Sequence, residues 1–186
     1  MKFWIKFFIF FFYSSIVFAN ITDDIVKKLS ETNNITFEFD QIINNQSETG
    51  KCLLVFPGKL RCIYNDKDEK EILIKNKSLY VIKHKFKRLY RYPIKSSAFN
   101  IILSKERIFK NLKLINNSNI KETTSSYFYE IKEDNGIYIK IFFNKKTKML
   151  EGWETISYNQ EPVKFVIINP EINQIINEKF ILPKYN

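Results

Sequence analysis

Apolar and polar side chains alternate along much of the chain after residue 34, which is typical of strands with one buried face. In ITFEFDQ, residues 35–41, Ile35, Phe37 and Phe39 share one side. Further apolar runs follow in both arms of a hairpin at residues 47–66, and in EILIK, SLYVIK and FKRLYRY. Only short polar links separate these six runs, so they predict an antiparallel meander.

The hairpin SETGKCLLVFPGKLRCIYND departs from alternation. Its first arm is apolar on both sides, with Cys52, Leu54 and Phe56 on one side and Leu53 and Val55 on the other. Gly50 marks its opening, and Pro57-Gly58 its turn. A three-residue loop that pairs Phe56 with Leu60 makes the two cysteines diagonal neighbours, too far apart for a relaxed disulfide, and a four-residue loop separates them onto opposite faces. Two cysteines fit an oxidising compartment, but whether Cys52 and Cys62 pair stays open.

Helical spacing of apolar residues occurs in two places. Thr22 is the predicted cap of a short N-terminal helix, whose apolar stripe comprises Ile21, Ile25, Val26 and Leu29. Residues 96–112, SSAFNIILSKERIFKNL, predict one or two short helices that begin after a Ser97 cap.

Strands resume in SYFYEIK and IYIKIFF. A three-residue loop, Asp134–Gly136, brings the apolar residues of both strands onto one face, so we expect Gly136 in the left-handed conformation. The segments MLEGWETISY, PVKFVIIN and KFILP are predicted to complete the sheet.

The first 19 residues have the features of a cleaved signal peptide. Lys2 and Lys6 precede an apolar run at residues 7–18, which is too short to span a membrane comfortably, and Ala19 stands at the expected cleavage site. We therefore expect a signal peptide at 1–19, a single domain at 20–186 and a periplasmic location. Asn20 would follow the cut, so no lipid anchor is expected at the new N-terminus.

The formal net charge of +10 could indicate nucleic acid or an anionic membrane as a partner. Lys, Asn, Ile and Phe are overused along the whole chain, however, and we interpret the charge as a solvated surface, with no nucleic-acid partner. The sequence offers few residues suited to catalysis, because His84 is the only histidine and is expected to be exposed in a loop without a nearby acid. We expect no catalytic residue, no metal site and no cofactor, and hence no enzyme.

Five segments in order resemble motifs of the periplasmic outer-membrane lipoprotein carrier (LolA) family: FEFDQ, GKCLLVFPGKLRCIY, NKSLYVI, YPIKSSAFNIIL and LEGWETISYNQEPVKFVIIN. The resemblance implies a mainly β fold, an open antiparallel half-barrel covered by short α-helices that form a lid over a hydrophobic cavity. Among the departures from the family pattern, Phe56 replaces an Arg that is implicated in holding the lid shut, and Cys62 replaces a Trp. An apolar latch, or one placed elsewhere, is therefore implied.

The resemblance also implies partners. Acylated lipoproteins would be the cargo, an inner-membrane lipoprotein-releasing ABC transporter the donor, and an outer-membrane protein, where the pathway has one, the acceptor. We expect a monomer. Two alternatives share this fold class or its ligand type: a lipocalin-like protein that binds small lipids, and a half-barrel that regulates an envelope stress response.

The cargo would occupy the cavity, whose lining follows from alternation in the strands and helical spacing in the lid. The predicted lipid-binding residues are Phe37, Phe39, Leu54, Phe56, Cys62, Tyr64, Ile72, Tyr80, Phe99, Ile102, Leu103, Phe109 and Trp153.

Overall fold

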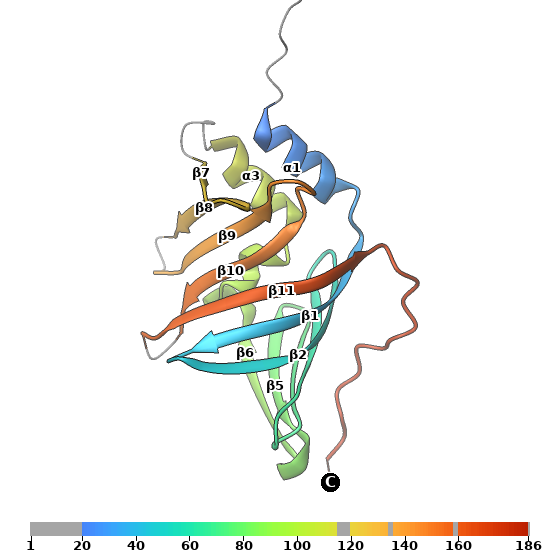
Figure 1. Cartoon of the computed structure of the whole chain (residues 1–186). Coiled ribbons are helices and arrows are strands. Elements are labelled where there is room, and N and C mark those ends of the chain that lie inside the picture. Colours follow the sequence, from blue (N-terminus) through green and yellow to red (C-terminus); the bar gives the residue numbers. More distant parts are fainter. Residues whose placement is uncertain (1–19, 115–119, 134–135, 158–159, 186) are drawn as a thin grey trace, which may run out of the picture.

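The protein is a curved antiparallel sheet with helices on its inner side (Figure 1). The computed structural model describes residues 20–114, 120–133, 136–157 and 160–185. The helical elements are α1 (Ile21–Ser30), η1 (His84–Phe86), η2 (Ile94–Ser96), α2 (Phe99–Ile102) and α3 (Lys105–Leu114). The strands are β1 (Asn34–Ile43), β2 (Gln46–Val55), β3 (Lys59–Tyr64), β4 (Lys70–Lys75), β5 (Ser78–Lys83), β6 (Arg88–Pro93), β7 (Lys121–Glu122), β8 (Ser126–Lys132), β9 (Tyr138–Asn144), β10 (Leu150–Ile156) and β11 (Pro162–Ile172). Among the described residues, no helix has the length and apolar character needed to cross a membrane.

All eleven strands form one sheet in the order β6-β5-β4-β3-β2-β1-β11-β10-β9-β8-β7. The sheet does not close, so β6 and β7 are its two edges. Buried residues of α1, α2 and α3 join those of the inner face in one core cluster. The predicted fold class, a mainly β open half-barrel with short covering helices, is therefore confirmed.

The register predicted for the β8–β9 hairpin is confirmed. Tyr129 lies opposite Ile141 and Ile131 opposite Ile139, which brings the apolar residues of both strands onto the inner face. Gly136 has φ +84°, the left-handed conformation that the three-residue loop requires. The first two residues of that loop, 134–135, lie outside the described residues.

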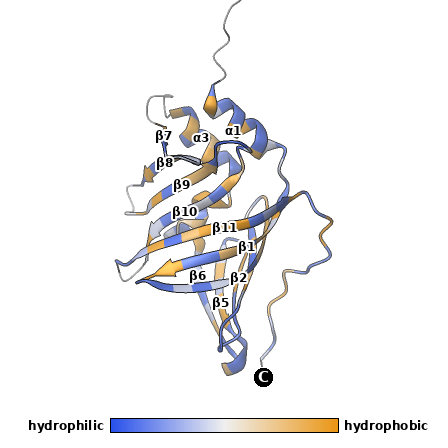
Figure 2. Ribbon diagram, viewed as in Figure 1, coloured by the Kyte–Doolittle hydropathy of each residue, from blue (hydrophilic) through white to orange (hydrophobic). Residues whose placement is uncertain are grey.

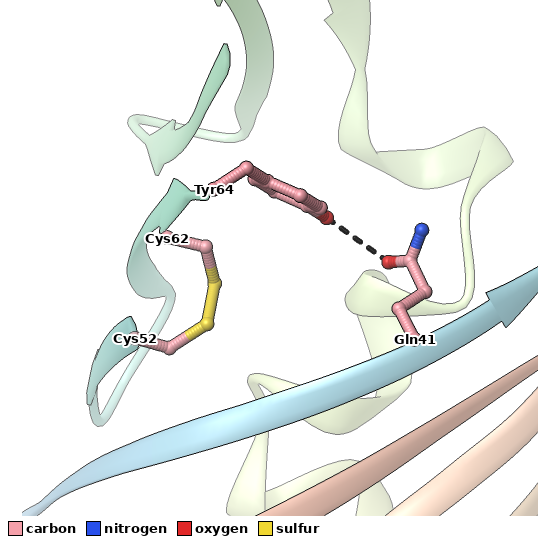
Figure 3. The surroundings of a disulfide bond; sticks show 4 residues. All are labelled: Gln41, Cys52, Cys62 and Tyr64. Carbon is pink, nitrogen blue, oxygen red and sulfur yellow. Dashed lines mark hydrogen bonds between the residues drawn. A yellow bond between two sulfur atoms is a disulfide. The ribbon is translucent and has the colours of Figure 1, made fainter. Parts of the chain in front are cut away.

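The predicted register of the β2–β3 hairpin is wrong by one residue on each strand. Val55, rather than Phe56, is the last paired residue and lies opposite Lys59, so that the three-residue loop is Phe56–Gly58. Cys52 then lies directly opposite Cys62 with their Cα atoms 4.1 Å apart, and the two form a disulfide (Figure 3). The hairpin thus has a covalent link across its inner face.

Gly50 lies inside β2 rather than opening a turn. It pairs with Phe39 on β1 and with Tyr64 on β3. A Cβ atom there would stand 2.1 Å from the Ile63 carbonyl oxygen and within 3 Å of the Phe39 ring. The glycine therefore lets the Phe39 ring approach the β2 backbone closely, and any larger residue would force the ring away.

Both predicted helix caps are wrong by a short distance along the chain. Asn20, not Thr22, caps α1, because its Oδ1 accepts a hydrogen bond from the Thr22 backbone N–H at 3.1 Å. In the lid, by which we mean α2 and α3, Ser97 does not cap α2, but Ser104 Oγ accepts a hydrogen bond from the Arg107 N–H at 3.2 Å at the start of α3. Short polar side chains cluster at both places, and spacing alone could not choose between them.

The C-terminal segment 173–185 is not a strand, which corrects the prediction for KFILP. It crosses the outer face of the sheet, where Phe180, Leu182 and Tyr185 pack on Leu73, Tyr80 and Ile82 (Figure 1). Arg61 on this face contacts Glu178 of the segment, and its cross-strand partner Leu53 is buried. The outer face of the sheet is therefore partly covered, and Leu53 on the outer side of the first hairpin arm is buried, as is the inner side of that arm.

Candidate functional site

The inner face of the half-barrel brings together all but one of the predicted lipid-binding residues. Eight are buried in the core cluster: Phe37, Phe39, Leu54, Cys62, Tyr64, Ile102, Leu103 and Trp153. Four more are half-buried and pack against it: Phe56, Ile72, Phe99 and Phe109. These side chains fill the interior by packing on one another, so the structure represents a closed arrangement.

Tyr80 is the exception and corrects the predicted lining. It pairs with Leu73 across the β4–β5 ladder and lies in the separate cluster beneath the C-terminal segment. Its strand alternates, but the polar-to-apolar contrast between its two faces is weak, because both faces of β4 and β5 carry apolar residues. Sequence alternation could not tell the inner face from the covered outer face.

A stack of aromatic rings lies at the centre of the inner face. Phe165 of β11 stacks on Trp153 of β10 at a centroid distance of 4.1 Å and on Phe39 of β1 at 4.8 Å. Phe99 of α2 meets Trp153 edge-on at 6.0 Å, which joins the lid to the sheet. Phe165 was missed in the sequence, although its alternation with Ile167 in PVKFVIIN gave the same signal as the other strands.

Rows of apolar side chains run across the inner face towards the β6 edge. One row follows the strand register through Phe37, Cys52, Cys62, Ile72, Val81 and Tyr90. Its first three members are buried, the next two are half-buried, and Tyr90 is 40% exposed. The neighbouring row passes through Leu54, Leu60, Ile74 and Leu79 and ends at Tyr92, which is 49% exposed. The apolar lining therefore continues from the closed core to the open edge.

Two tyrosine hydroxyls lie inside this apolar interior. Tyr64 donates to Gln41 Oε1 at 3.0 Å (Figure 3), whereas Tyr129 has no hydrogen-bond partner among the described residues. Burial raises the pKa of both phenols, with Glu48 and Asp66 adding to the effect at Tyr64. Both hydroxyls therefore stay neutral in the folded protein at physiological pH.

The lid is attached to the β2–β3 turn by a small set of contacts. The Gly58 N–H donates to the Leu103 carbonyl at 3.0 Å. Lys105 Nζ lies 5.2 Å from the centroid of the Phe56 ring and donates to the Ser30 carbonyl at 3.1 Å. Burial lowers the pKa of Lys105. Turn, lid and the end of α1 thus meet around one lysine.

An open cleft of about 720 Å³ lies beside α3 and includes none of the predicted lipid-binding residues. Its lining is mainly polar and charged: Ser104, Glu106, Arg107, Lys110, Asn111, Leu114, Ile131, Lys132 and Glu133. Such a lining does not suit an acyl chain, so the cleft is not part of the candidate site.

His84 is not the isolated loop residue that the sequence suggested. Its Nε2 lies 2.7 Å from Glu71 Oε2, and its Nδ1 lies 2.8 Å from the Tyr185 hydroxyl. Glu71 is only 4% exposed and also accepts from Arg61 Nε at 2.8 Å. These contacts pair the buried Glu71 carboxylate and hold Tyr185, near the end of the chain, against His84. Neither contact involves the inner face. Among the described residues, no cluster of three His, Cys, Asp or Glu could hold a metal ion.

Sequence comparison matches this chain to a known family. The family model described as outer membrane lipoprotein carrier protein LolA matches residues 30–181. The chain belongs to the LolA family. The predicted resemblance is therefore confirmed. A comparison with curated protein sequences found no match.

One of three similar solved structures reaches a TM-score that indicates a shared fold with this LolA-family chain. An uncharacterized conserved protein from Thermus thermophilus has a TM-score of 0.51 at 7% identity, over 88% of this chain and 93% of that one. A LolA superfamily protein from Nitrosomonas europaea has a TM-score of 0.41 at 9% identity, over 87% and 97%. The MucA/MucB complex structure of Pseudomonas aeruginosa includes a chain with a TM-score of 0.48 at 8% identity, over 86% of this chain and 59% of that one.

Within the LolA family, Phe56 is the departure with a clear structural counterpart. The resemblance implies an Arg before the turn proline, but here the turn supplies an aromatic ring and the lid supplies the cation, Lys105. The contact between turn and lid at this position is therefore a cation–π pair.

Proposed function

We propose that this protein is a periplasmic carrier that binds the acyl chains of lipoproteins released from the inner membrane and delivers them to the outer membrane. Residues 1–19 would be removed as a signal peptide, and residues 20–186 would act as a single carrier domain. An inner-membrane lipoprotein-releasing ABC transporter would supply the cargo, and it would pass to an outer-membrane acceptor where one exists. The chain would work without a cofactor and would catalyse no reaction.

The apolar rows of the inner face are the observation that carries this proposal. Each buried methylene contributes roughly 0.8 kcal/mol, so leaving one long acyl chain in water costs on the order of 10 kcal/mol. A carrier must offer a matching apolar surface that is protected in the empty state. The rows that begin at Phe37 and Leu54 supply that surface, and their half-buried members near β6 give an acyl chain a place to begin binding.

Loading would require α2 and α3 to move away from the sheet, because their side chains fill the space an acyl chain needs. The attachments that oppose this movement at the β2–β3 turn are the Gly58–Leu103 hydrogen bond and the Lys105–Phe56 contact. A neutral hydrogen bond and a partly exposed cation–π pair each contribute about 1 kcal/mol. The acyl chains would replace the packing that the lid loses, so opening and loading would be coupled.

A photo-crosslinking residue at Phe99 tests the proposal. Phe99 is half-buried in α2 and packs on Trp153, so an aromatic photoprobe fits there with little disturbance. Phe128 is the matched control, since it is also a half-buried aromatic residue but belongs to β8 and packs against Phe142 on the outer face. We expect irradiation of living cells to link acylated lipoproteins to position 99 and not to position 128.

Other outcomes would favour the alternatives. Crosslinking of position 99 to a free small lipid alone would favour a lipocalin-like binder. Crosslinking to a protein without acyl chains would favour a regulator of an envelope stress response. Equal crosslinking at positions 99 and 128 would remove the support for an interior binding site.

A further inference from the structure

The segment between Glu71 and Glu106 contains no acidic residue. It carries nine basic ones: Lys75, Lys77, Lys83, Lys85, Lys87, Arg88, Arg91, Lys95 and Lys105. Basic residues occur throughout the chain, but here they are not interspersed with acids. The overall charge of the protein is therefore locally concentrated on the elements that this segment forms, chiefly β5, η1 and β6.

The β5–β6 hairpin projects from one end of the half-barrel, with η1 at its tip (Figure 1). We define residues 85–92, KFKRLYRY, as the hairpin patch, and every one of them is exposed. The patch alternates four basic residues with four apolar or aromatic ones. Figure 2 shows the hydrophilic colour dominating the lower end of this hairpin.

The cations of the hairpin patch are available to a partner. Within the described part of the chain, Lys85, Lys87, Arg88 and Arg91 take part in no ion pair, and Arg91 only donates to Ser78 Oγ at 3.1 Å. The neighbouring β3–β4 loop carries three acids. Asp68 is paired with Lys83 at 2.8 Å and Asp66 lies near Lys70 at 3.9 Å, whereas Glu69 is exposed and forms no ion pair among the described residues. The four cations of the patch therefore outnumber the one acid of this loop that is not already paired.

The large apolar side chains of the patch are unusually exposed for a folded domain. Phe86 at the tip is 50% exposed, and Lys83 and Lys85 place their ammonium groups 6.0 and 5.8 Å from its ring centroid. Tyr90 and Tyr92 continue the exposed row along β6. Exposed aromatic residues next to unpaired cations match the interfacial region of a membrane, where rings lie at the headgroup level and cations meet phosphate groups.

We propose that the hairpin patch docks the protein on a membrane surface that contains anionic phospholipids. Lys85, Lys87 and Arg88 contact the headgroup phosphates, and Phe86 inserts its ring at the interface. The proposal does not depend on carrier activity, because it concerns the outer end of the molecule and needs no cargo. It places the open β6 edge of the inner face close to the lipid surface, where an acyl chain could pass between protein and bilayer.

Vesicle sedimentation tests this docking. The protein is purified from the cells that produce it, without altering either end of the chain. It is mixed at low salt either with phosphatidylcholine vesicles that contain about 30 mol% phosphatidylglycerol or with pure phosphatidylcholine vesicles. The pure vesicles report any binding that does not need anionic headgroups. We expect binding to the anionic vesicles only, and its loss when the salt concentration approaches about 1 M.

A triple charge reversal, Lys85→Glu/Lys87→Glu/Arg88→Glu, should lower the vesicle partition coefficient by about 100-fold or more, since each basic residue near an anionic surface contributes about a factor of five. The matched control is Lys27→Glu/Lys110→Glu/Lys113→Glu, which changes the net charge equally at exposed helix positions that form no ion pair among the described residues. Phe86→Ser should lower binding by a smaller factor and leave its salt dependence unchanged.

The proposal is overturned if the wild-type protein does not bind anionic vesicles, if it binds neutral vesicles equally, or if the control triple variant loses as much binding as the hairpin variant. The first result would leave an acidic protein surface as the partner to test. Circular dichroism of each variant shows whether it has kept its fold, and a hairpin variant that unfolds is replaced by the single reversals, each expected to lose about fivefold.

Discussion

At the scale of single residues, the least expected feature of the interior is the Tyr129 hydroxyl. It is buried among apolar side chains, 1% exposed, and has no hydrogen-bond partner in the described part of the chain. Burying a hydroxyl without a partner costs about 1–3 kcal/mol. The ring itself packs well, since it lies parallel to Phe143 at 6.0 Å.

We therefore predict that Tyr129→Phe leaves the free energy of unfolding unchanged or raises it by about 1 kcal/mol. Tyr64→Phe is the control, because this hydroxyl is also buried but donates to Gln41. Its removal should lower the free energy of unfolding by about 1 kcal/mol. Urea unfolding followed by tryptophan fluorescence gives both values, and a larger loss for Tyr129→Phe than for Tyr64→Phe would show that the Tyr129 hydroxyl has a stabilising partner.

Lys105 connects three parts of the structure around the lid. Its ammonium group lies over the Phe56 ring and donates a hydrogen bond to the Ser30 carbonyl. Partial burial disfavours the charged form of the ammonium group and so lowers its pKa. We predict that Lys105→Met increases lid opening about tenfold, since the two contacts together contribute about 1–2 kcal/mol. Amide hydrogen exchange should show this as faster exchange in α2 and α3, with β1 and β2 unchanged.

Lys110→Met provides the comparison for Lys105→Met, because Lys110 belongs to the same helix but is exposed. If both variants exchange at the wild-type rate, Lys105 has no part in holding the lid. If Lys105→Met accelerates exchange throughout the sheet, its effect is on global stability and not on the lid.

At the scale of elements, the two hairpins show what alternation can and cannot predict. In β8–β9 the charged residues of both strands lie on the outer face, so a single register brought Ile131 and Ile139 together on the inner face, and the sequence identified it. In β2–β3 the shift of one residue on each strand keeps every side chain on its own face, so alternation could not detect it, and the predicted register was wrong. The Cys52–Cys62 disulfide requires the correct register, so it could not be predicted while the register was wrong.

The disulfide should stabilise the β2–β3 hairpin by closing a short loop in the unfolded chain. We predict that Cys52→Ala/Cys62→Ala lowers the free energy of unfolding by about 2–3 kcal/mol. Adding a reductant should destabilise the wild-type protein and leave the double variant unaffected. Equal sensitivity of both proteins to the reductant would mean that the bond does not form in solution.

At the scale of the whole molecule, the C-terminal segment decides which faces of the sheet are buried. Phe180 and Leu182 cover Leu73, Tyr80 and Ile82, and Lys75 Nζ donates to the Phe180 carbonyl at 2.8 Å. The sequence assigned this segment to a strand because its residues are apolar, and it assigned Tyr80 to the cavity because no cover for the outer face was expected. The apolar pattern thus identified most of the inner face, but not a cover made by an irregular segment.

We predict that Phe180→Ala lowers the free energy of unfolding by about 1–2 kcal/mol, because it exposes part of the cluster on the outer face. Ile175→Ala in the same segment should have no effect, since Ile175 is 91% exposed. Thermal and urea unfolding measure both. Equal stabilities for the two variants would show that the segment does not cover the sheet in solution.

The central claim is that the inner face holds acyl chains that are attached to protein. Native mass spectrometry of the protein, purified under mild conditions from an extract of the cell envelope, measures this directly. We predict a complex whose added mass resolves, after proteolysis, into acylated N-terminal peptides of lipoproteins. The Phe99→Asp variant, which places a carboxylate at a half-buried position of α2, should remain folded and carry much less of this mass. Recovery of only free lipid, of protein without acyl chains, or of an empty chain from cells that export lipoproteins would contradict the claim.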